Sequence, residues 1–190
     1  NAENVSFNNG GALLVSDFKT EVAQEKISNY SINTKFGRNP ESDTGTVPET
    51  IWNGGGVYNG YPATAAIVEI NSSSTADTSA GTGARTLTVK GLDANFDPIQ
   101  EIVTLNGLTR VDTVNSYIRL FRAYIESAGS GATNAGLINM RQKTATTVVF
   151  GSMPIGTGQT TIAADTVPNG KRRIITHLYS AITRASGAAG

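Results

Sequence analysis

Residues 85–107 have the sequence RTLTVKGLDANFDPIQEIVTLNG, and this stretch decides the fold class. Two runs of alternating apolar and polar residues flank the polar stretch Asp93–Pro98, and an Asn-Gly pair ends the second run. Alternation with a period of two is typical of strands, and polar turns between such runs predict hairpins. The same pattern continues from Ile67 to Met140. The sequence therefore predicts an all-β protein with an antiparallel, β-sandwich or jelly-roll-like domain.

The composition suits one domain, or one domain with an extended arm, in a chain of 190 residues. Charged residues make up 16% of the chain, well below the usual share of about 25%. The surface must therefore be largely neutral and polar. Such a surface suits a protein packed among neighbours, although a lone secreted β domain would have a similar composition.

Several classes of protein are excluded by simple counts. The net charge is zero, so no overall basic field attracts nucleic acid. The chain has no cysteine, which rules out disulfides, thiolate metal sites and a cysteine nucleophile. No apolar run approaches the roughly 20 residues of a membrane-spanning helix. We therefore expect neither nucleic acid nor membrane as a partner.

Charge is divided unevenly along the chain. Residues 1–95 hold six Lys or Arg and ten Asp or Glu, whereas residues 96–190 hold nine and five, so the balance changes from −4 to +4. Copies that met front to back would gain complementary fields. Chance segregation that cancels in the folded protein explains the same numbers equally well.

Residues 1–60 are predicted to form an extended, mostly irregular N-terminal arm. Their apolar residues are sparse and follow no sustained period, which is typical of a segment that lies on something else. Within this arm, Asp17–Ile27 is compatible with a short helix capped by Ser16 or Asp17, with Phe18, Val22 and Ile27 facing inward. A helix of that length is marginal by itself.

Residues 61–186 are predicted to form the β body. Tyr117–Ile125 is compatible with a buried strand or with a helix that begins at Ser116, and its aromatic and β-branched content favours the strand. The other expected strands are Ala65–Ile70, the two runs of the hairpin, Leu137–Met140, Thr144–Phe150, Gln159–Ala163 and Arg172–Ile182. The last run has no evident partner, which indicates that the chain continues beyond residue 190 or that another chain supplies the partner strand.

Several short segments, in order along the chain, carry a family resemblance. They are Lys35–Pro40, Glu49–Gly56, Ser73–Arg85, Gly91–Asn95, Leu105–Gly107, Arg119–Tyr124, Ala128–Ser130 and Asn134–Gly136. Over about residues 17–140 the chain resembles a family of virion-associated structural proteins of tailed bacteriophages, many from aquatic environments and mostly uncharacterised. The resemblance implies a part of a phage particle, and it brings no catalytic residues. It weakens after about residue 145.

Motifs for catalysis or metal binding are lacking in the sequence. His177 is the only histidine, and a packing or surface role suits it better than general-base or metal chemistry. No Gly-x-Ser-x-Gly occurs, and the glycine groups match no phosphate-binding fingerprint. Asp93, Asn95 and Asp97 have the spacing of a calcium loop, but Pro98 stands where such a loop needs glycine. We therefore predict a turn there, and no catalytic residue, cofactor or metal.

Basic and aromatic residues are the remaining candidates for contact with partners. Lys171-Arg-Arg173 is the densest basic run, and a solvated strand edge explains it better than a phosphate contact. Arg119 and Arg122 would face opposite ways on a strand and share one side of a helix. The expected interface residues are Phe18, Phe36, Arg38, Trp52, Arg119, Arg122, Lys171 and Arg173.

Three functional classes fit these features. The first is a non-enzymatic virion protein, assembled in the bacterial host cytoplasm, that decorates and cements the capsid as a homotrimer bound to the major capsid protein or another virion protein. The second is the attachment domain of a head-vertex, tail or fibre protein such as a head fibre. The third is a carbohydrate-binding β domain, but the single tryptophan and the few acidic residues of the body do not favour it.

Overall fold

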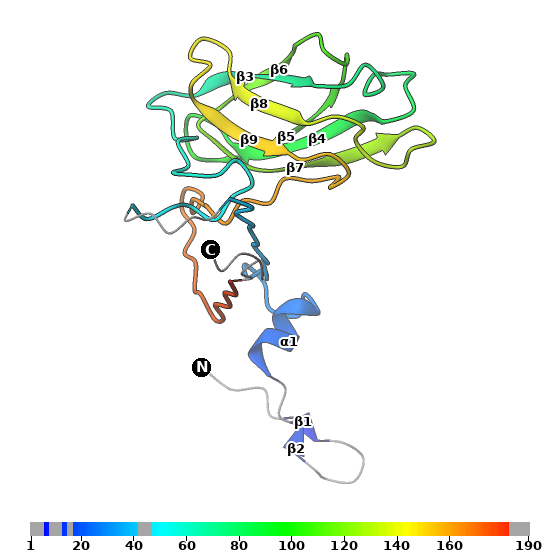
Figure 1. The fold of residues 1–190 in the computed structure, drawn as a ribbon. Helices are drawn as coiled ribbons and strands as arrows, with labels where there is room; N and C mark the ends of the chain where they lie inside the picture. Colours follow the sequence, from blue (N-terminus) through cyan, green and yellow to red (C-terminus); the bar gives the residue numbers. More distant parts are fainter. Residues whose placement is uncertain (1–5, 8–12, 15–16, 42–46, 183–190) are drawn as a thin grey trace, which may run out of the picture. The chain divides into compact units, whose positions relative to one another are not determined.

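The structure, a computed structural model, describes residues 6–7, 13–14, 17–41 and 47–182. The chain divides into two units, Asn1–Lys35 and Phe36–Gly190. In the first unit, strands β1 (Ser6–Phe7) and β2 (Leu13–Leu14) pair in antiparallel fashion, and helix α1 (Phe18–Ala23) follows (Figure 1).

Helix α1 is shorter than the stretch Asp17–Ile27 that was predicted to contain it. Asp17 occupies the N-cap position, although its side chain makes no capping hydrogen bond. At the other end, Glu25 has a positive φ of 58°, and its N–H donates to the carbonyl of Val22. A left-handed residue after the last turn closes a helix, so the chain turns away before Ile27.

Inside this helix only part of the predicted inward face is buried. Val22 is buried as expected. Phe18 was expected to face inward, but it is 52% exposed and packs edge-on against Tyr30, with 5.3 Å between the ring centroids. Six residues make fewer than two turns, which is too short to bury a whole apolar stripe.

The described part of the second unit contains seven strands in two antiparallel sheets that lie face to face (Figure 1). The strand order is β6-β3-β8-β9 in one sheet and β5-β4-β7 in the other. The strands are β3 (Ala66–Ser72), β4 (Ala84–Leu92), β5 (Pro98–Thr104), β6 (Val111–Tyr117), β7 (Arg119–Ala128), β8 (Ile138–Gln142) and β9 (Val149–Met153). The fold is an all-β sandwich, which confirms the predicted fold class.

The core of the sandwich comes from the alternating apolar residues of both sheets. Leu87 and Val89, on one side of β4, are fully buried, whereas Thr86 and Lys90, on the other side, are only partly buried. Other large buried side chains in this core are Val68, Ile70, Tyr117, Ile138, Met140, Phe150 and Met153. Burial of this apolar surface is the main driving force for the fold.

The hairpin that opened the sequence argument forms as predicted. β4 and β5 pair from Thr86 opposite Thr104 to Leu92 opposite Pro98. In the turn, the Asp93 carboxylate accepts hydrogen bonds from the N–H groups of Asn95 and Asp97, at 2.8 and 2.9 Å. Side-chain acceptors of this kind stabilise tight turns, so the carboxylate of Asp93 serves the turn.

Tyr117–Ile125 is a strand region, as favoured, and the helical alternative is wrong. β6 ends at Tyr117 and β7 begins at Arg119, with the N–H of Ile118 bonded to the carbonyl of Leu92 at 2.9 Å. The chain thus passes from one sheet to the other at a corner. Its aromatic and β-branched side chains pack well on a pleated surface, which explains the outcome.

An irregularity in β7 corrects the predicted orientation of its two arginines. Arg119 lies opposite Leu92 and Arg122 opposite Lys90, because the register shifts between these pairs and Phe121 is an extra residue. Leu92 and Lys90 are two positions apart on β4, so their partners share one side of the sheet. A β-bulge of this kind re-aims side chains, which parity counting along one strand cannot foresee.

The C-terminal strand predictions are wrong in part. Of Thr144–Phe150 only the last two residues lie in β9, and Gln159–Ala163 forms only isolated bridges at Gln159 and Ile162. Arg172–Ile182 forms neither strand nor helix. A run with strand propensity becomes a strand only when a sheet edge pairs with it, and none does so here.

Residues 36–60 belong to the unit that contains the sandwich, and those that the structure describes, 36–41 and 47–60, contain no helix or named strand. Trp52 forms an isolated antiparallel bridge with Ile162, and both pack with Tyr58 in a second buried cluster. The boundary between the two units therefore lies after Lys35, and the arm expected over residues 1–60 is divided between them.

Candidate interaction surfaces

Edge strand β7 is covered by residues 158–160. The N–H of Ile125 donates to the carbonyl of Gly158 at 2.9 Å, and the N–H of Thr160 donates to the carbonyl of Ala123 at 2.9 Å. The N–H of Ala123 donates in turn to the Thr160 hydroxyl at 3.0 Å. These bonds occupy the outward backbone groups in the middle of β7, so a further strand cannot pair there.

Edge strand β9 is covered by side chains of the segment before the sandwich. The Tyr58 hydroxyl donates to the carbonyl of Phe150 at 2.9 Å, and the Asn53 amide donates to the carbonyl of Ser152 at 2.7 Å. Asn59 makes similar bonds at the start of the strand. Polar side chains thus engage the outward carbonyls of β9 at Phe150 and Ser152.

Edge strand β6 is blocked by one carboxylate. Glu101 on β5 accepts hydrogen bonds from the N–H groups of Val114 and Asn115, at 2.8 and 3.1 Å. An inward-reaching charge on an edge is a common protection against strand addition. The side chain of Val114 itself is exposed.

Strand β5 is the remaining edge, and it is open. Bonds at the two ends of the hairpin, from Asp93 N–H to Asp97 and from Leu105 N–H to Arg85, fix the alternation along β5. Because outward and inward groups alternate in an antiparallel pair, three residues present backbone groups away from β4: Gln100, Ile102 and Thr104. In the described part of the chain, these groups form no hydrogen bond with another residue.

Aromatic rings and one arginine connect the segment before the sandwich to the start of β7. The ring centroids of Trp52 and Tyr58, and those of Tyr58 and Tyr61, lie 5.1 Å apart in edge-on contacts. The Arg119 guanidinium lies 4.9 Å from the Tyr61 ring and 5.5 Å from the Phe96 ring. Cation–π contacts of this kind add stability when partly desolvated, so Arg119 acts as a bracket between three parts of the chain.

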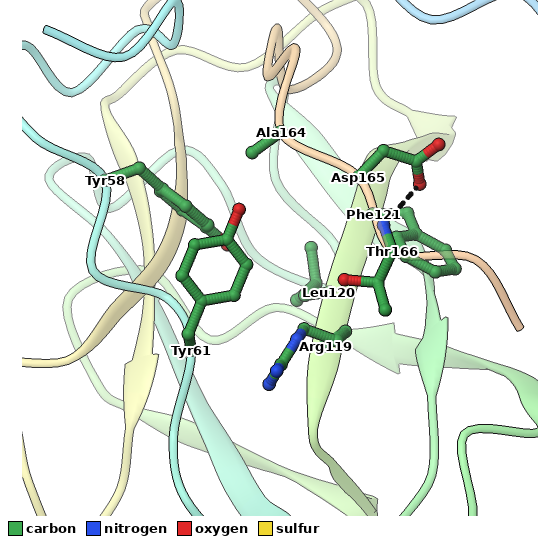
Figure 2. A pocket seen from close by; sticks show the side chains of 8 residues that line it. All are labelled: Tyr58, Tyr61, Arg119, Leu120, Phe121, Ala164, Asp165 and Thr166. Atoms are coloured by element: carbon green, nitrogen blue, oxygen red, sulfur yellow. Dashed lines mark hydrogen bonds between the residues drawn. The ribbon is translucent and has the colours of Figure 1, made fainter. Parts of the chain in front are cut away.

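A shallow hollow beside this bracket is lined by Tyr58, Tyr61, Arg119, Leu120, Phe121, Ala164, Asp165 and Thr166 (Figure 2). It does not enclose space for a water molecule, whereas small-molecule sites are usually deep clefts of at least about 300 Å³. Burial, and after it the nearby Tyr61, raise the pKa of Tyr58 against the effect of Arg119. The Tyr58 hydroxyl therefore stays protonated and serves as a donor to β9.

Asp77 is completely buried, and its carboxylate forms no ion pair with another residue that the structure describes. It accepts hydrogen bonds from the Ser72 hydroxyl at 2.6 Å and from the N–H groups of Ala84, Ala135 and Gly136 at 2.7 to 2.9 Å. Burial acts to raise the pKa of this carboxyl, but the four hydrogen bonds outweigh it, and the pKa lies below the usual value. Asp77 is therefore a structural anion with its acceptor positions filled.

Asn134 is a second buried polar centre at the same end of the sandwich. Its amide donates to the carbonyls of Gly136 and Pro154, at 2.7 and 2.8 Å, and its oxygen accepts the N–H of Gly158 at 3.1 Å. Such polar groups specify one arrangement of the loops around them. The loops at this end of the sandwich are thus held together by two buried side chains, Asp77 and Asn134.

The outer face of the β5-β4-β7 sheet carries a small cationic cluster. Lys90 and Arg122 are opposite each other in register, and their charges lie 5.4 and 5.2 Å from the ring of Tyr124. Arg122 also donates to Gln159 at 2.7 Å. Like charges directly opposite are unfavourable on a sheet, and the tyrosine ring offsets part of this cost.

The eight expected interface residues are dispersed. Phe18, Phe36 and Arg38 are exposed, and so are Arg122, Lys171 and Arg173, of which Arg173 pairs with Asp165. Trp52 is buried and Arg119 is half-buried. These two residues are connected within the chain through the rings of Tyr58 and Tyr61.

Several important residues were missed by sequence reasoning. They include Tyr58, Tyr61, Asp77 and Glu101. Their roles depend on partners far along the chain, such as Phe150 for Tyr58, Arg119 for Tyr61 and Ala135 for Asp77, so local pattern gives no signal. The one hint was a lone aspartate, Asp77, in a loop rich in Ser, Thr and Gly.

Metal and membrane features were sought in the described residues. Within them, no group of three His, Asp or Glu side chains is placed to hold a metal ion. In the same residues, no helix has the length and apolar character needed to cross a membrane. His177 is exposed and lies 3.3 Å from the Thr176 hydroxyl.

Comparison with protein-family models, with curated proteins and with solved structures finds no match to this chain. The fold itself defines the class of protein as an all-β sandwich of two antiparallel sheets. Among the residues that the structure describes, three edges of that sandwich have covering groups and β5 has none.

Proposed function

We propose that this chain is a non-enzymatic structural protein of a tailed-bacteriophage particle and that it decorates and cements the capsid. The observation that carries the proposal is the set of large apolar side chains exposed on segments outside the sandwich: Ile51, Val57, Tyr61, Ile174, Ile175, Leu178, Tyr179 and Ile182. Large exposed apolar surface is typical of sites that bind other proteins. The resemblance of residues 17–140 to phage virion proteins supports the same function.

In this proposal the sandwich is a rigid block and the flanking segments join it to its neighbours. Three covered edges and the filled acceptor positions of Asp77 favour a body that keeps its shape. The exposed segments gain contacts on the particle that offset the entropy cost of ordering them. The partners are further copies, in a homotrimer, and the major capsid protein or another virion protein.

A second candidate is the attachment domain of a head-vertex, tail or fibre protein. The specific observation in its favour is the division of the chain into two units after Lys35. Separate compact units of one chain commonly move relative to each other, which suits a protein in which one unit binds the particle and the other is presented to its surroundings.

Quantitative mass spectrometry of gradient-purified particles tests the proposal. Decoration of the capsid predicts copies in numbers comparable to those of the major capsid protein, which means hundreds in a particle. A few dozen copies would favour the vertex, tail or fibre alternative. Absence of the protein from purified particles would overturn both.

A further inference from the structure

We propose that residues 172–182 of one copy add as a strand to the open edge of β5 in a second copy. The inference rests on the proposed function, because it names the surfaces through which copies on a particle join. It commits to a second copy of this chain as the occupant of the edge.

β5 is the acceptor because it is the edge strand without covering groups in the described part of the chain. β7, β9 and β6 have their outward groups occupied by residues 158–160, by side chains before the sandwich and by Glu101. On β5 the outward groups of Gln100, Ile102 and Thr104 have no hydrogen-bond partner among the described residues, and the Ile102 side chain is 61% exposed. An uncovered edge is a template for another strand.

The donor is the segment that was predicted to be a strand and forms none in the isolated chain. Its large apolar residues are 77% to 93% exposed, namely Ile174, Ile175, Leu178, Tyr179 and Ile182. Alternate positions of this run place Ile174, Leu178 and Ile182 on one side of an extended strand. A strand with that pattern buries one apolar row and completes its backbone hydrogen bonds on a sheet edge.

Charges on the two elements are complementary. Asp93 and Asp97 lie in the turn before β5, and Glu101 lies within the strand. The donor begins with Lys171 and Arg172, both exposed. Addition parallel to β5 brings these cations to the acidic turn, and complementary charge favours that register over the reverse one.

A turn inside the chain favours exchange between copies. The N–H of Asn169 donates to the carbonyl of Phe96 at 2.9 Å, so the segment departs beside the start of β5. The turn that follows, with Gly170 at φ 66° and Lys171 N–H bonded to Pro168 at 3.2 Å, leads the chain away from its own edge. In Figure 1 the reddish last part of the drawn chain runs away from the sheets. Each copy therefore offers an exposed donor segment outside any sheet and, among the described residues, an acceptor edge without a backbone partner.

Donor and acceptor lie at different places on the surface, so the contact is heterologous. Contacts of this type close into rings when the rotation between copies allows it, and otherwise they form open chains. A ring of three copies agrees with the expected homotrimer. The opposite charge balance of the two halves of the chain, −4 and +4, agrees with copies that meet front to back.

Two full-length variants separate donor from acceptor. Ile102→Pro removes an outward N–H from β5 and should block the acceptor, since proline is tolerated on an edge but cannot donate. Ile175→Pro/Leu178→Pro should block the donor, because the two prolines lie on opposite parities of the run. The matched control Ile102→Thr keeps the N–H and the strand propensity.

Sedimentation velocity of purified proteins is the measurement. Wild type and the threonine control should associate, each proline variant alone should sediment as a monomer, and an equimolar mixture of the two should restore a mixed complex. Association of both proline variants like wild type, or a mixture that stays monomeric, would overturn the proposal. Hydrogen exchange that protects both segments in a monomeric wild type would instead assign the edge to the segment of the same copy, and would also overturn it.

Failure here is distinguishable from failure of the proposed function. Sedimentation reports association of the free protein, whereas the amount in purified particles reports the virion role. A particle-bound protein that stays monomeric in solution with an unprotected β5 edge would retain the virion role and remove only the strand exchange.

Discussion

At the scale of single residues, Asp77 shows how a buried charge is kept without a counter-charge. Four donors from three parts of the chain converge on it. Hydrogen bonds to an ionised group are stronger than those between neutral groups. Asp77 therefore joins the loop before β4 to the loop before β8.

The substitution Asp77→Asn should destabilise the protein. The new amide can accept at only one atom, so N–H groups now bonded to the carboxylate would face another donor. We expect a loss of about 3 kcal/mol in the free energy of unfolding. Urea denaturation measures this, and Asp97→Asn, an exposed position in the β4–β5 turn, is the matched control and should change little. An unchanged midpoint for Asp77→Asn would contradict the assigned role.

The pH dependence of that loss follows from the lowered pKa of Asp77. A carboxyl with a lower pKa in the folded state contributes stability that is complete above its unfolded pKa of about 4. The contribution is lost as the pH falls through the folded pKa. The difference between wild type and Asp77→Asn should therefore be largest near neutral pH and narrow below about pH 4. A difference that does not change with pH would show that Asp77 is not the titrating group.

Trp52 was expected at an interface, and the structure places its side chain in the cluster with Tyr58 and Ile162. Trp52→Ala should lower the free energy of unfolding by about 3 to 5 kcal/mol, because it leaves a large cavity. Thermal unfolding checks this, with exposed Phe36→Ala as the control. A loss of particle binding with an unchanged melting temperature would contradict this and would show that Trp52 contacts a partner, as the sequence predicted.

At the scale of elements, the sequence predicts what local pattern controls. The hairpin of β4 and β5 was predicted because its turn and both alternating runs lie within 23 consecutive residues. Covering of the edges was not predicted, because the bonds between Ala123 and Thr160 or between Asn53 and Ser152 join residues far apart in the chain. The bulge at Phe121 likewise depends on the partner strand.

The same reasoning explains the outcome for Arg172–Ile182. Its composition favours a strand, and propensity can be read from the sequence. Whether an edge is free to pair with it depends on the whole fold. The contacts of Arg119 with Tyr61 and Phe96 could not be predicted from the sequence either. Tyr61 and Arg119 meet only because the segment before β3 packs against β7.

Gly91 on β4 lies close to the backbone at the corner between β6 and β7. A Cβ atom at this position would lie 2.1 Å from the carbonyl oxygen of Arg119, so the backbone would have to shift. Gly91→Ala should therefore cost about 1 to 3 kcal/mol. Lys90→Ala, next to it and pointing outward, is the control, and equal unfolding midpoints for the two variants would contradict the close approach.

At the scale of the whole molecule, the two units correct the predicted extent of the arm. Residues 36–60 contribute Trp52 and Tyr58 to the buried cluster and cover β9, so they are part of the folded body. The exposed apolar side chains left to join neighbours lie before Phe36, after Gly170 and on the outside of the segment before β3, where Ile51 and Val57 are exposed. Tyr30 and Tyr179 are among them.

Limited proteolysis tests this division. Trypsin should cut the free protein near Lys26 or Lys35 and at Lys171–Arg173, and should leave a resistant fragment that begins close to Phe36, because cleavage follows local opening. Mass spectrometry of the fragments identifies the boundary. In particles the same sites should be protected. A resistant fragment that begins near residue 61 would instead support the arm predicted from the sequence, residues 1–60.

The central claim is that this sandwich is a component of a phage particle, and a cryo-electron microscopy reconstruction of the purified particle tests it most directly. The account predicts density on the outside of the capsid shell that fits two antiparallel sheets of four and three strands, repeated with the shell lattice. A fully resolved particle in which head, vertices, tail and fibres are all assigned to other chains would contradict it.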